Sequence, residues 1–451
     1  MKRSLSLLGT ACVLAFAGTS SVLVADPSAL GTSLTAMGAE VAANAAGTIP
    51  AFTGGLSEPV AGYVAGGHYP DPYADDKPLF TIDAGNAEKY KANLTPGQIA
   101  LLNKYPTWKM SVYLTQRSAT FPKANLDETI ANATQAKLAT GGNGVVGTTG
   151  GVPFPIPKDG LEAIWNTLLR YKGDTYAMNW SQAAVTRDGA YTPVRFEYEY
   201  DFHYGNLARG EKEQREPNKL ANFLQTVTAP ARLAGQILLV REAVDQLKEP
   251  RTAWTYNPGQ RRVRLAPNIA YDNPGTAADG LRTTDDFGMF NGGTDRYNWK
   301  LVGKQELYVP YNSYKLSGNT LKMADVLRPG HINPEHARYE LHRVWVVEAT
   351  IKDGTSHIYA KRTFYIDEDS WLIMVSDKYD ARGELWRVSE QHSINFYNVP
   401  MQYGTIEVHH DLQSDRYLAM GLRNEEPKVY EKINRSDADF TPAGLRGVGT
   451  R

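Results

Sequence analysis

Two adjacent carboxylates, Asp285 and Asp286, lie in a glycine-rich stretch that runs from residue 273 to 293. Paired carboxylates can serve as an acid and a base, or can bind calcium. A calcium loop needs further oxygen donors at regular spacing, and this stretch lacks them. The run Thr283-Thr284-Asp285-Asp286-Phe287 also indicates a short helix that these side chains would cap.

Structureless stretches of this length are uncommon in compact domains and often contribute to function. We therefore keep three interpretations of 273–293: a capped turn, the lid or rim of a binding site, and a catalytic loop. The lid or rim candidates are Asp279, Arg282, Asp285 and Asp286.

A second cluster, formed by Glu407, His409, His410 and Asp411, has side chains of the kind that bind metals. On a strand, neighbouring side chains point to opposite faces, so the two histidines cannot readily share one ion.

The chain also lacks a glycine-flanked serine elbow, a phosphate loop, a dinucleotide fingerprint and an HExxH zinc helix. We expect no catalytic residues, no metal and no cofactor.

The charge balance argues against a polyanionic partner. Lysine and arginine total 48, aspartate and glutamate total 49, and the formal net charge is -1. Nucleic-acid binding depends on a basic surface field, so we expect no nucleic-acid partner. The 451 residues are 42% hydrophobic, which is enough for one large core or two ordinary ones.

The first 25 residues are typical of a secretory signal peptide. Lys2 and Arg3 precede an apolar run, and small residues lead to Ala25, after which we expect cleavage. The single cysteine, Cys12, lies inside the apolar run without a leucine-led lipoprotein box, so we expect neither lipid attachment nor a disulfide. No later segment reaches the ~20 apolar residues of a membrane span. We expect a soluble periplasmic protein.

Three helices are expected before residue 174, over 95–104, 127–138 and 159–170, on the basis of capping residues and apolar stripes. From residue 174 the hydrophobic period changes to two. Strands are predicted over 174–187, 193–204, 235–246, 251–257, 260–266, 296–303, 305–311, 340–351, 356–366, 371–379 and 384–397. Turns between the last four predict an antiparallel meander, and a sheet of this size must curl or be covered.

The run RFEYEYDFHY, residues 195–204, alternates without a break between aromatic and polar side chains. Its aromatic face is either ordinary core under a helix or the wall of a cavity for an apolar ligand. Applying the same alternation to the other strands, the candidate cavity residues are Phe196, Tyr198, Tyr200, Phe202, Trp254, Tyr256, Trp345, Trp371, Ile373 and Trp386.

Long segments resemble the proteobacterial secreted proteins of domain-of-unknown-function family 1329, often labelled outer-membrane lipoprotein-sorting-like. They include LTAMGAEVAANAAGTIPAFTGGL, GVPFPIPKDGLEAIWNTLLRY, the run from PARLAGQILLV to DDFGMFNG, and DRYNWKLVGKQELYVPYN. Met37 stands where the family pattern has proline, and Phe52 where it has tryptophan.

The resemblance implies a fold similar to the carriers LolA and LolB, whose curved barrel with a helical lid holds acyl chains. We accordingly expect a mainly β (α+β) fold, with a curved, incompletely closed antiparallel β half-barrel covered by helices. The resemblance also implies transport of hydrophobic compounds, with a resistance-nodulation-division-type permease of the inner membrane and an outer-membrane protein as partners. It brings no catalytic residues with it.

The expected organisation has four parts. Residues 1–25 form the signal peptide, 26–158 an N-terminal arm with helices that pack on the sheet, 159–422 the curved sheet with its lid helix and loop, and 423–451 a C-terminal tail.

The function we expect is a periplasmic carrier or accessory protein that binds a lipid or other hydrophobic molecule for transport across the envelope. Such binding needs no covalent chemistry. Two alternatives remain open. One is a bridging subunit of an envelope transport complex that has no ligand of its own. The other is a secreted hydrolase of a lipid or polymer that uses Asp285, Asp286 and a histidine.

Overall fold

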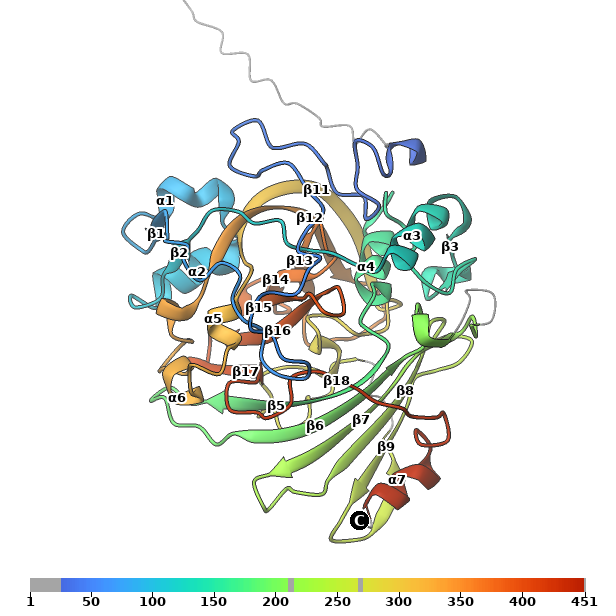
Figure 1. Ribbon diagram of the computed structural model, residues 1–451. Helices are drawn as coiled ribbons and strands as arrows, with labels where there is room; N and C mark the ends of the chain where they lie inside the picture. Colours follow the sequence, from blue (N-terminus) through green and yellow to red (C-terminus); the bar gives the residue numbers. More distant parts are fainter. Residues whose placement is uncertain (1–25, 210–214, 267–270, 450–451) are drawn as a thin grey trace, which may run out of the picture.

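The computed structural model describes residues 26–209, 215–266 and 271–449, and the predicted signal peptide lies outside them. One large sheet dominates the described chain, and its helices are short (Figure 1). The helices are α1 (Ala87–Tyr90), α2 (Pro96–Lys104), α3 (Lys123–Gln135), α4 (Gly160–Leu169), α5 (Tyr314–Ser317), α6 (Met323–Val326) and α7 (Pro442–Gly449).

The strands divide between the main sheet and one small hairpin, formed by β3 (Lys137–Leu138) and β4 (Val145–Val146). The strands of the main sheet are β1 (Phe80–Ile82), β2 (Met110–Val112), β5 (Thr175–Val185), β6 (Val194–Phe202), β7 (Lys219–Ala229), β8 (Ile237–Ala243), β9 (Thr252–Asn257), β10 (Arg262–Leu265), β11 (Tyr297–Pro310), β12 (Tyr339–Ile351), β13 (Lys361–Asp367), β14 (Ile373–Tyr379), β15 (Leu385–Phe396), β16 (Met401–Asp411), β17 (Arg416–Leu422) and β18 (Glu431–Lys432).

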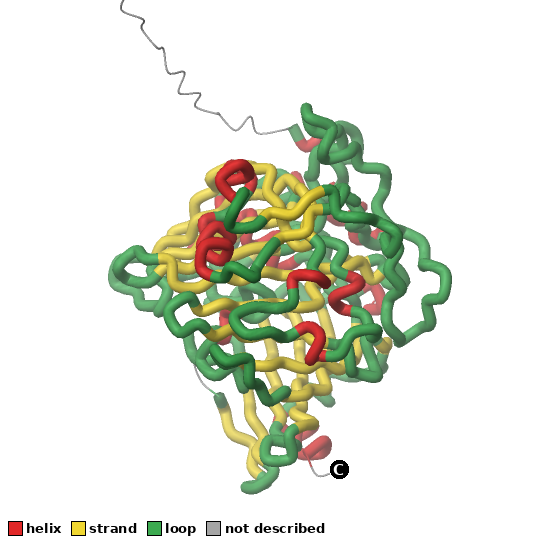
Figure 2. The backbone as a smooth tube through the Cα atoms, turned by 90° about the vertical axis from the view of Figure 1, so that its left-hand side faces the viewer, coloured by secondary structure: helices red, strands yellow, loops and turns green. Residues whose placement is uncertain are grey.

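In the described chain the main sheet is 16-stranded, in the order β1-β2-β12-β13-β14-β15-β16-β17-β5-β6-β7-β8-β9-β10, with β11 paired to β12 and β18 to β5. Its pairings are antiparallel apart from the parallel contact of β2 with β12. The end strands β1 and β10 do not pair with each other, so the sheet curves without closing into a barrel (Figures 1 and 2). The predicted fold class is confirmed.

The predicted meander is present as β12 to β15. Gly354 and Gly383 turn the chain between its strands with φ of 78° and 79°, a conformation that glycine adopts without steric cost. The two strands predicted over 296–303 and 305–311 are one strand, β11, with a bulge between Leu301 and Gly303.

Three long strands, β7, β16 and β17, were not predicted from the alternation. In β7 and β16 the buried positions include polar side chains, such as Gln225 and His409, which break the apolar pattern. In β17, Gly421 adopts a φ of 79° beside a shift in register, which interrupts the period. These strands matter because β16 and β17 join the meander to β5, and β7 joins β6 to β8.

Two of the predicted helices form where their caps indicate. Asp159 accepts a hydrogen bond from the backbone N–H of Glu162 at 2.9 Å, and α4 packs on β11 and β12. Thr95 caps α2, which packs on β14 and β15. The helix expected over 127–138 runs instead over 123–135, because residues 137–138 belong to the small hairpin.

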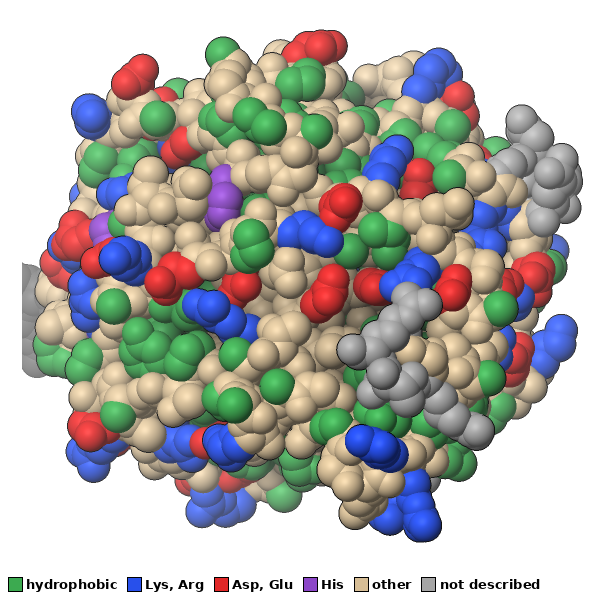
Figure 3. All heavy atoms as spheres, turned by 60° about the horizontal axis from the view of Figure 1, so that its bottom comes forward, with side chains coloured by type: hydrophobic (Ala, Val, Ile, Leu, Met, Phe, Trp, Pro, Cys, Tyr) green, Lys and Arg blue, Asp and Glu red, His purple; other side chains and the backbone are tan. Residues whose placement is uncertain are grey.

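The chain before β1 crosses the sheet as an arm with almost no regular secondary structure (Figure 1). The carbonyl of Met37 accepts a hydrogen bond from Trp371 Nε1 at 2.9 Å, and the ring of Tyr69 stacks on Phe396 at 4.4 Å. The arm therefore contributes side chains to the main core. On the face shown in Figure 3, basic and acidic side chains are interspersed.

Candidate functional site

Two adjoining cavities lie between the curved sheet and the loop of residues 271–293. Their volumes are about 100 Å³ and about 320 Å³, and we call them the polar cavity and the apolar cavity. Phe223, Glu242, Phe287 and Asn291 line both, so the cavities meet at these four side chains.

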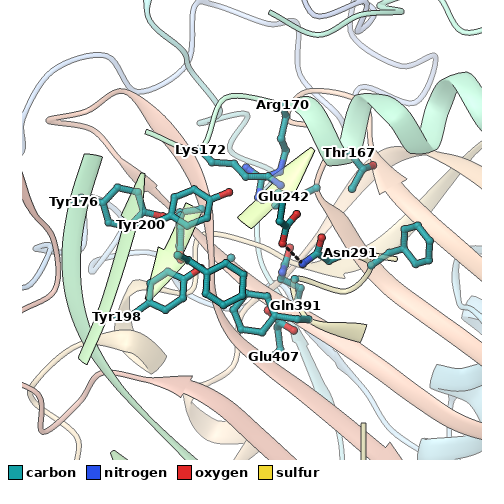
Figure 4. Close-up of a pocket in the computed structure, with 17 residues that line it drawn as sticks. Thr167, Arg170, Lys172, Tyr176, Tyr198, Tyr200, Glu242, Asn291, Gln391 and Glu407 are labelled. Carbon is teal, nitrogen blue, oxygen red and sulfur yellow. Dashed lines mark hydrogen bonds between the residues drawn. The ribbon is translucent and has the colours of Figure 1, made fainter. Parts of the chain in front are cut away.

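The polar cavity collects side chains from distant parts of the chain (Figure 4). One wall is aromatic and comes from β5, β6 and β7, with Tyr176, Tyr198, Tyr200 and Phe223. The other wall comes from β15 and β16, with Gln391, Tyr403, Gly404 and Glu407. The end of α4 and the residues after it contribute Thr167, Arg170 and Lys172, and the loop contributes Phe287, Gly288, Phe290 and Asn291.

The alternation of β6 builds the aromatic wall. Tyr198 stacks beside Tyr200 at 5.8 Å between ring centres, and Phe223 lies 5.6 Å from Tyr198. Phe287 of the loop lies parallel to Phe223, with 10° between the rings at 6.3 Å. The loop therefore closes over the aromatic face through one of its own rings.

Two cations face the polar cavity at the end of α4. Nη1 of Arg170 donates to the carbonyls of Tyr171 and Gln402 at 3.4 and 3.3 Å. Burial lowers the pKa of Arg170 to about 10, and burial followed by the neighbouring Arg170 lowers the pKa of Lys172 to about 7. Within the described chain, neither residue forms an ion pair with a carboxylate.

The two carboxylates of the polar cavity have different surroundings. Glu242 accepts a hydrogen bond from Asn291 at 3.2 Å and pairs with Arg251 at 3.3 Å. Glu407 lies 3.4 Å from His409 Nε2. Burial raises the pKa of the three tyrosines of this wall, at 176, 198 and 200, well above the usual value, so their hydroxyls remain neutral donors.

The apolar cavity lies over β7 to β9. Leu238 and Val240 of β8 face it, together with Ala266, Pro274 and the two shared phenylalanines. The neighbouring side chains of β8, Ile237 and Leu239, belong instead to a core cluster with Leu445 of α7. The two faces of this part of the sheet thus serve different purposes, one packed by α7 and one left hollow.

Asp285 and Asp286 anchor the loop to the sheet rather than lining either cavity. Asp285 pairs with Arg362 at 2.8 Å and with His357 at 3.0 Å. Asp286 pairs with Lys378 at 2.9 Å. Burial opposes its ionisation, but the charges of Lys378 and Arg362 prevail and hold the pKa of Asp286 well below its usual range.

The predicted capping role is confirmed as well. A 3-10 helix, η6 (Thr284–Asp286), forms here, and the backbone N–H of Thr283 donates to Asp286 Oδ2 at 3.2 Å. Arg282 lines the apolar cavity, with its guanidinium 5.5 Å from the centre of the Phe287 ring. Asp279 is exposed and pairs with Arg416 at 2.8 Å.

The ten aromatic and aliphatic candidates separate into two groups. Tyr198 and Tyr200 line the polar cavity. The other eight lie outside the lining of both cavities, in core or partly buried positions: Phe196, Phe202, Trp254, Tyr256, Trp345, Trp371, Ile373 and Trp386.

The placement of these eight follows from their contacts. Phe196 stacks on Trp180 at 4.6 Å, and Tyr256 is part of the cluster packed by α7. Trp345 and Trp371 stack on each other at 6.1 Å beside the arm. Alternation identifies the face of each strand, but the packing elements decide which part of that face stays hollow.

The histidines of β16 point apart, as expected for neighbours on a strand. His409 Nδ1 lies 2.8 Å from Ser389 Oγ, whereas the ring of His410 stacks on Tyr417 at 5.5 Å. Both ring nitrogens of His357 are also occupied. Nε2 pairs with Asp285, and Nδ1 accepts a hydrogen bond from the backbone N–H of Tyr359 at 3.0 Å, so neither nitrogen faces a cavity.

Sequence reasoning missed the cations and the loop aromatics of the polar cavity. Arg170 and Lys172 are spaced by two on an extended segment, a spacing that places both on one side with Tyr171 on the other. The spacing could be read from the sequence, but it indicates a binding site only once this side of the segment is known to face a cavity. Phe223 was missed together with its strand, β7.

The chain matches the family model described as Protein of unknown function (DUF1329) over residues 81–446, and it belongs to this family. A Pseudomonas aeruginosa relative, described as uncharacterized protein PA3922, is 50% identical over 454 residues, which cover 99% of this chain and 97% of the relative.

Two solved structures show a partial likeness in fold. An outer membrane lipoprotein-sorting protein domain from Vibrio parahaemolyticus has 13% identity and a TM-score of 0.43, covering 64% of this chain and 98% of that domain. The LolA superfamily protein NE2245 from Nitrosomonas europaea has 15% identity and a TM-score of 0.36, covering 61% of this chain and 93% of that protein. Among the described residues, no helix is both long and apolar enough to cross a membrane.

Proposed function

We propose that this protein is a periplasmic carrier that holds a lipid or another hydrophobic molecule between its curved sheet and the loop of residues 271–293. The single observation that carries the proposal is the pair of adjoining cavities, which meet at Phe223 and Phe287. Cavities of about 300–1,000 Å³ with mainly apolar walls are typical of small-molecule sites, and the apolar cavity falls at the lower end of that range.

Binding by burial requires no catalytic group. At ~25 cal/mol per Å² of apolar surface, covering a few hundred Å² of a hydrocarbon chain stabilises the complex by several kcal/mol before ordering costs. The carboxylates and histidine that a hydrolase would use are instead tied to Arg362 and Lys378, away from the cavities. We therefore propose a carrier rather than an enzyme.

The periplasmic location rests on the signal-like pattern of the first residues. The partners we propose are those that the family resemblance implies, an inner-membrane permease and an outer-membrane protein. Crosslinking in intact cells, followed by purification of this protein, tests for them directly.

The carrier proposal is tested by native mass spectrometry of the protein purified from the periplasm without detergent, combined with lipid extraction. A defined added mass that extracts as a lipid or other apolar compound supports it. A protein that is empty, and that also fails to take up Nile red and long-chain alcohols, contradicts it and favours a bridging subunit.

Phe287→Ala should weaken the binding of an apolar probe by about tenfold or more, because the ring closes both cavities and contributes apolar contact area. The matched control is Trp254→Ala, which also removes an aromatic ring but does so beside the cluster packed by α7. Titration of Nile red fluorescence measures both. Equal losses in the two variants would mean that the loop ring is not part of the binding surface.

A further inference from the structure

The two cavities contain more positive than negative side chains. Arg170, Lys172, Arg251 and Arg282 line them, against two carboxylates, Glu242 and Glu407. Glu242 pairs with Arg251 at 3.3 Å, and Glu407 is the acid whose charge acts most strongly on Arg282. Arg170 and Lys172 are left without a carboxylate partner in the described chain, and they lie next to each other (Figure 4).

This arrangement is costly for the empty protein. Arg170 is only 8% exposed, and its Nε has no hydrogen-bond partner. Lys172 forms neither a hydrogen bond nor an ion pair with any described residue, and its Nζ lies 5.9 Å from the centre of the Phe202 ring. Burying a cation without a partner is unfavourable, and an anion placed in the cavity would remove that cost.

Neutral donors surround the two cations. Thr167 Oγ1 is buried in the same lining and has no hydrogen-bond partner. The hydroxyls of Tyr176, Tyr198 and Tyr200 likewise have none among the described residues, and Figure 4 shows Tyr200 next to Lys172, with Tyr176 and Tyr198 on the same wall. Cations combined with hydroxyl donors suit the oxygen atoms of a carboxylate or a phosphate, since charge-assisted hydrogen bonds are the strong ones.

We infer that the ligand is an amphiphile with an anionic head, a carboxylate or a phosphate monoester, held by Arg170 and Lys172. Its hydrocarbon part runs past Phe223 and Phe287, where the two cavities meet, into the apolar cavity over Leu238 and Val240. This inference rests on the proposed carrier function and adds the chemical class of the ligand.

Displacement of Nile red from the full mature chain tests the head group. The competitors share one C16 chain: palmitate, hexadecyl phosphate, hexadecanol and hexadecyltrimethylammonium. We expect at least one anion to bind tenfold or more tightly than hexadecanol, and the cation to bind most weakly. The order of palmitate and hexadecyl phosphate identifies which anion the site prefers.

The outcomes separate the two proposals. If hexadecanol binds as tightly as both anions, the anionic head group is wrong while the carrier function stands. If none of the four compounds displaces the dye, and the dye itself does not bind, the carrier function fails.

Lys172→Met should reduce the affinity for the preferred anion about tenfold or more and leave hexadecanol unchanged, because methionine keeps the apolar stem and removes the charge. The control is Arg264→Met, which removes an exposed cation on β10. A loss of anion and alcohol binding by the same factor would indicate a structural role for Lys172 and would overturn the inference.

The unliganded Lys172→Met protein should unfold at the same temperature as the unaltered protein or a higher one, since the substitution removes an unpaired, largely buried cation. This measurement keeps the binding result interpretable, because a variant that is equally stable has not lost its cavity through misfolding. A large fall in unfolding temperature would show that Lys172 stabilises the empty fold, which contradicts the inference.

The pH profile gives an independent readout. In the empty cavity the pKa of Lys172 is about 7, lowered first by burial and then by Arg170; Glu242 and Arg251 are the other charged groups that act on it. A bound anion raises this pKa, so affinity for palmitate should be constant between the pKa of its own carboxyl group and about pH 7, and should fall as pH rises above about 7. The profile should be flat for hexadecanol, and flat for palmitate in Lys172→Met; a sloped palmitate profile in that variant would contradict the assignment.

Discussion

An Asp286→Asn protein should lose about 3–5 kcal/mol of its free energy of unfolding, because the substitution leaves the ammonium group of Lys378 uncompensated in the core. Asp286 and Lys378 are both fully buried, and the pair at 2.9 Å joins the loop to β14. Asp286 also accepts a hydrogen bond from the hydroxyl of Tyr359 at 3.0 Å, so the carboxylate joins the loop both to β14 and to the segment before β13.

The measurement is the midpoint of unfolding by urea and by heat, on the full mature chain. The matched control is Asp279→Asn, which breaks an exposed pair of the same loop, with Arg416, and should change stability by less than about 1 kcal/mol. A double replacement, Asp286→Leu with Lys378→Met, should recover much of the lost stability, since an apolar pair leaves no buried charge. Equal stability of Asp286→Asn and the unaltered protein would show that the loop is not held by this pair.

The loop anchor has a consequence for binding. Because Phe287 follows Asp286 directly, release of the carboxylate should let the ring withdraw from Phe223 and open the junction of the two cavities. Faster release of a bound apolar probe is therefore expected in Asp286→Asn at temperatures where the variant remains folded.

Replacing both Tyr198 and Tyr200 with glutamate should abolish retention of an apolar ligand. The two rings form the middle of the aromatic wall and are 4% and 9% exposed. Carboxylates at these positions remove two rings from the wall of the polar cavity and add negative charge beside Arg170 and Lys172, where it would repel the anionic head of the ligand. The measurement is the amount of lipid that copurifies with the secreted protein, together with Nile red titration.

The control for this pair is Glu197→Gln on the same strand. Glu197 is paired across the strand ladder with Asn179 and Thr226 and points away from the aromatic face, so its loss should leave ligand retention unchanged. If the double glutamate variant does not fold, Tyr200→Ala supplies a milder test that removes area from the same wall. Undiminished ligand in either folded variant would show that this wall is not the binding surface.

Much of the architecture could be predicted because it depends on interactions between residues that are close in sequence. The alternation of 195–204, the glycine turns at 354 and 383, and the caps at Thr95 and Asp159 each act through neighbours in sequence. The strands β7 and β16 escaped prediction for the complementary reason. Their polar buried positions are stabilised by partners on other strands, as His409 is by Ser389 of β15. In β17 the shift in register at Gly421 interrupts the period.

The candidate site could be predicted only in outline. The loop of 273–293 and the aromatic face of β6 were recognised from composition and period, and the family from long runs of residues. Which aromatics line a cavity was not accessible, because Tyr198 and Tyr256 carry the same alternating signal and differ only in what packs over them.

The sequence by itself determined the family, the mainly β class, the meander and the amphipathic helix α4, because capping, turn formation and strand alternation operate over a few residues. Only the tertiary structure decided the cavity, since its walls come from residues 167–172, from β5 to β8, from 287–291 and from β15 and β16. The tertiary structure also decided which charged side chains gain a partner of opposite charge. Asp285 and Asp286 gained buried cations from distant strands, whereas Arg170 and Lys172 were brought to a cavity where no carboxylate of the described chain forms an ion pair with either of them.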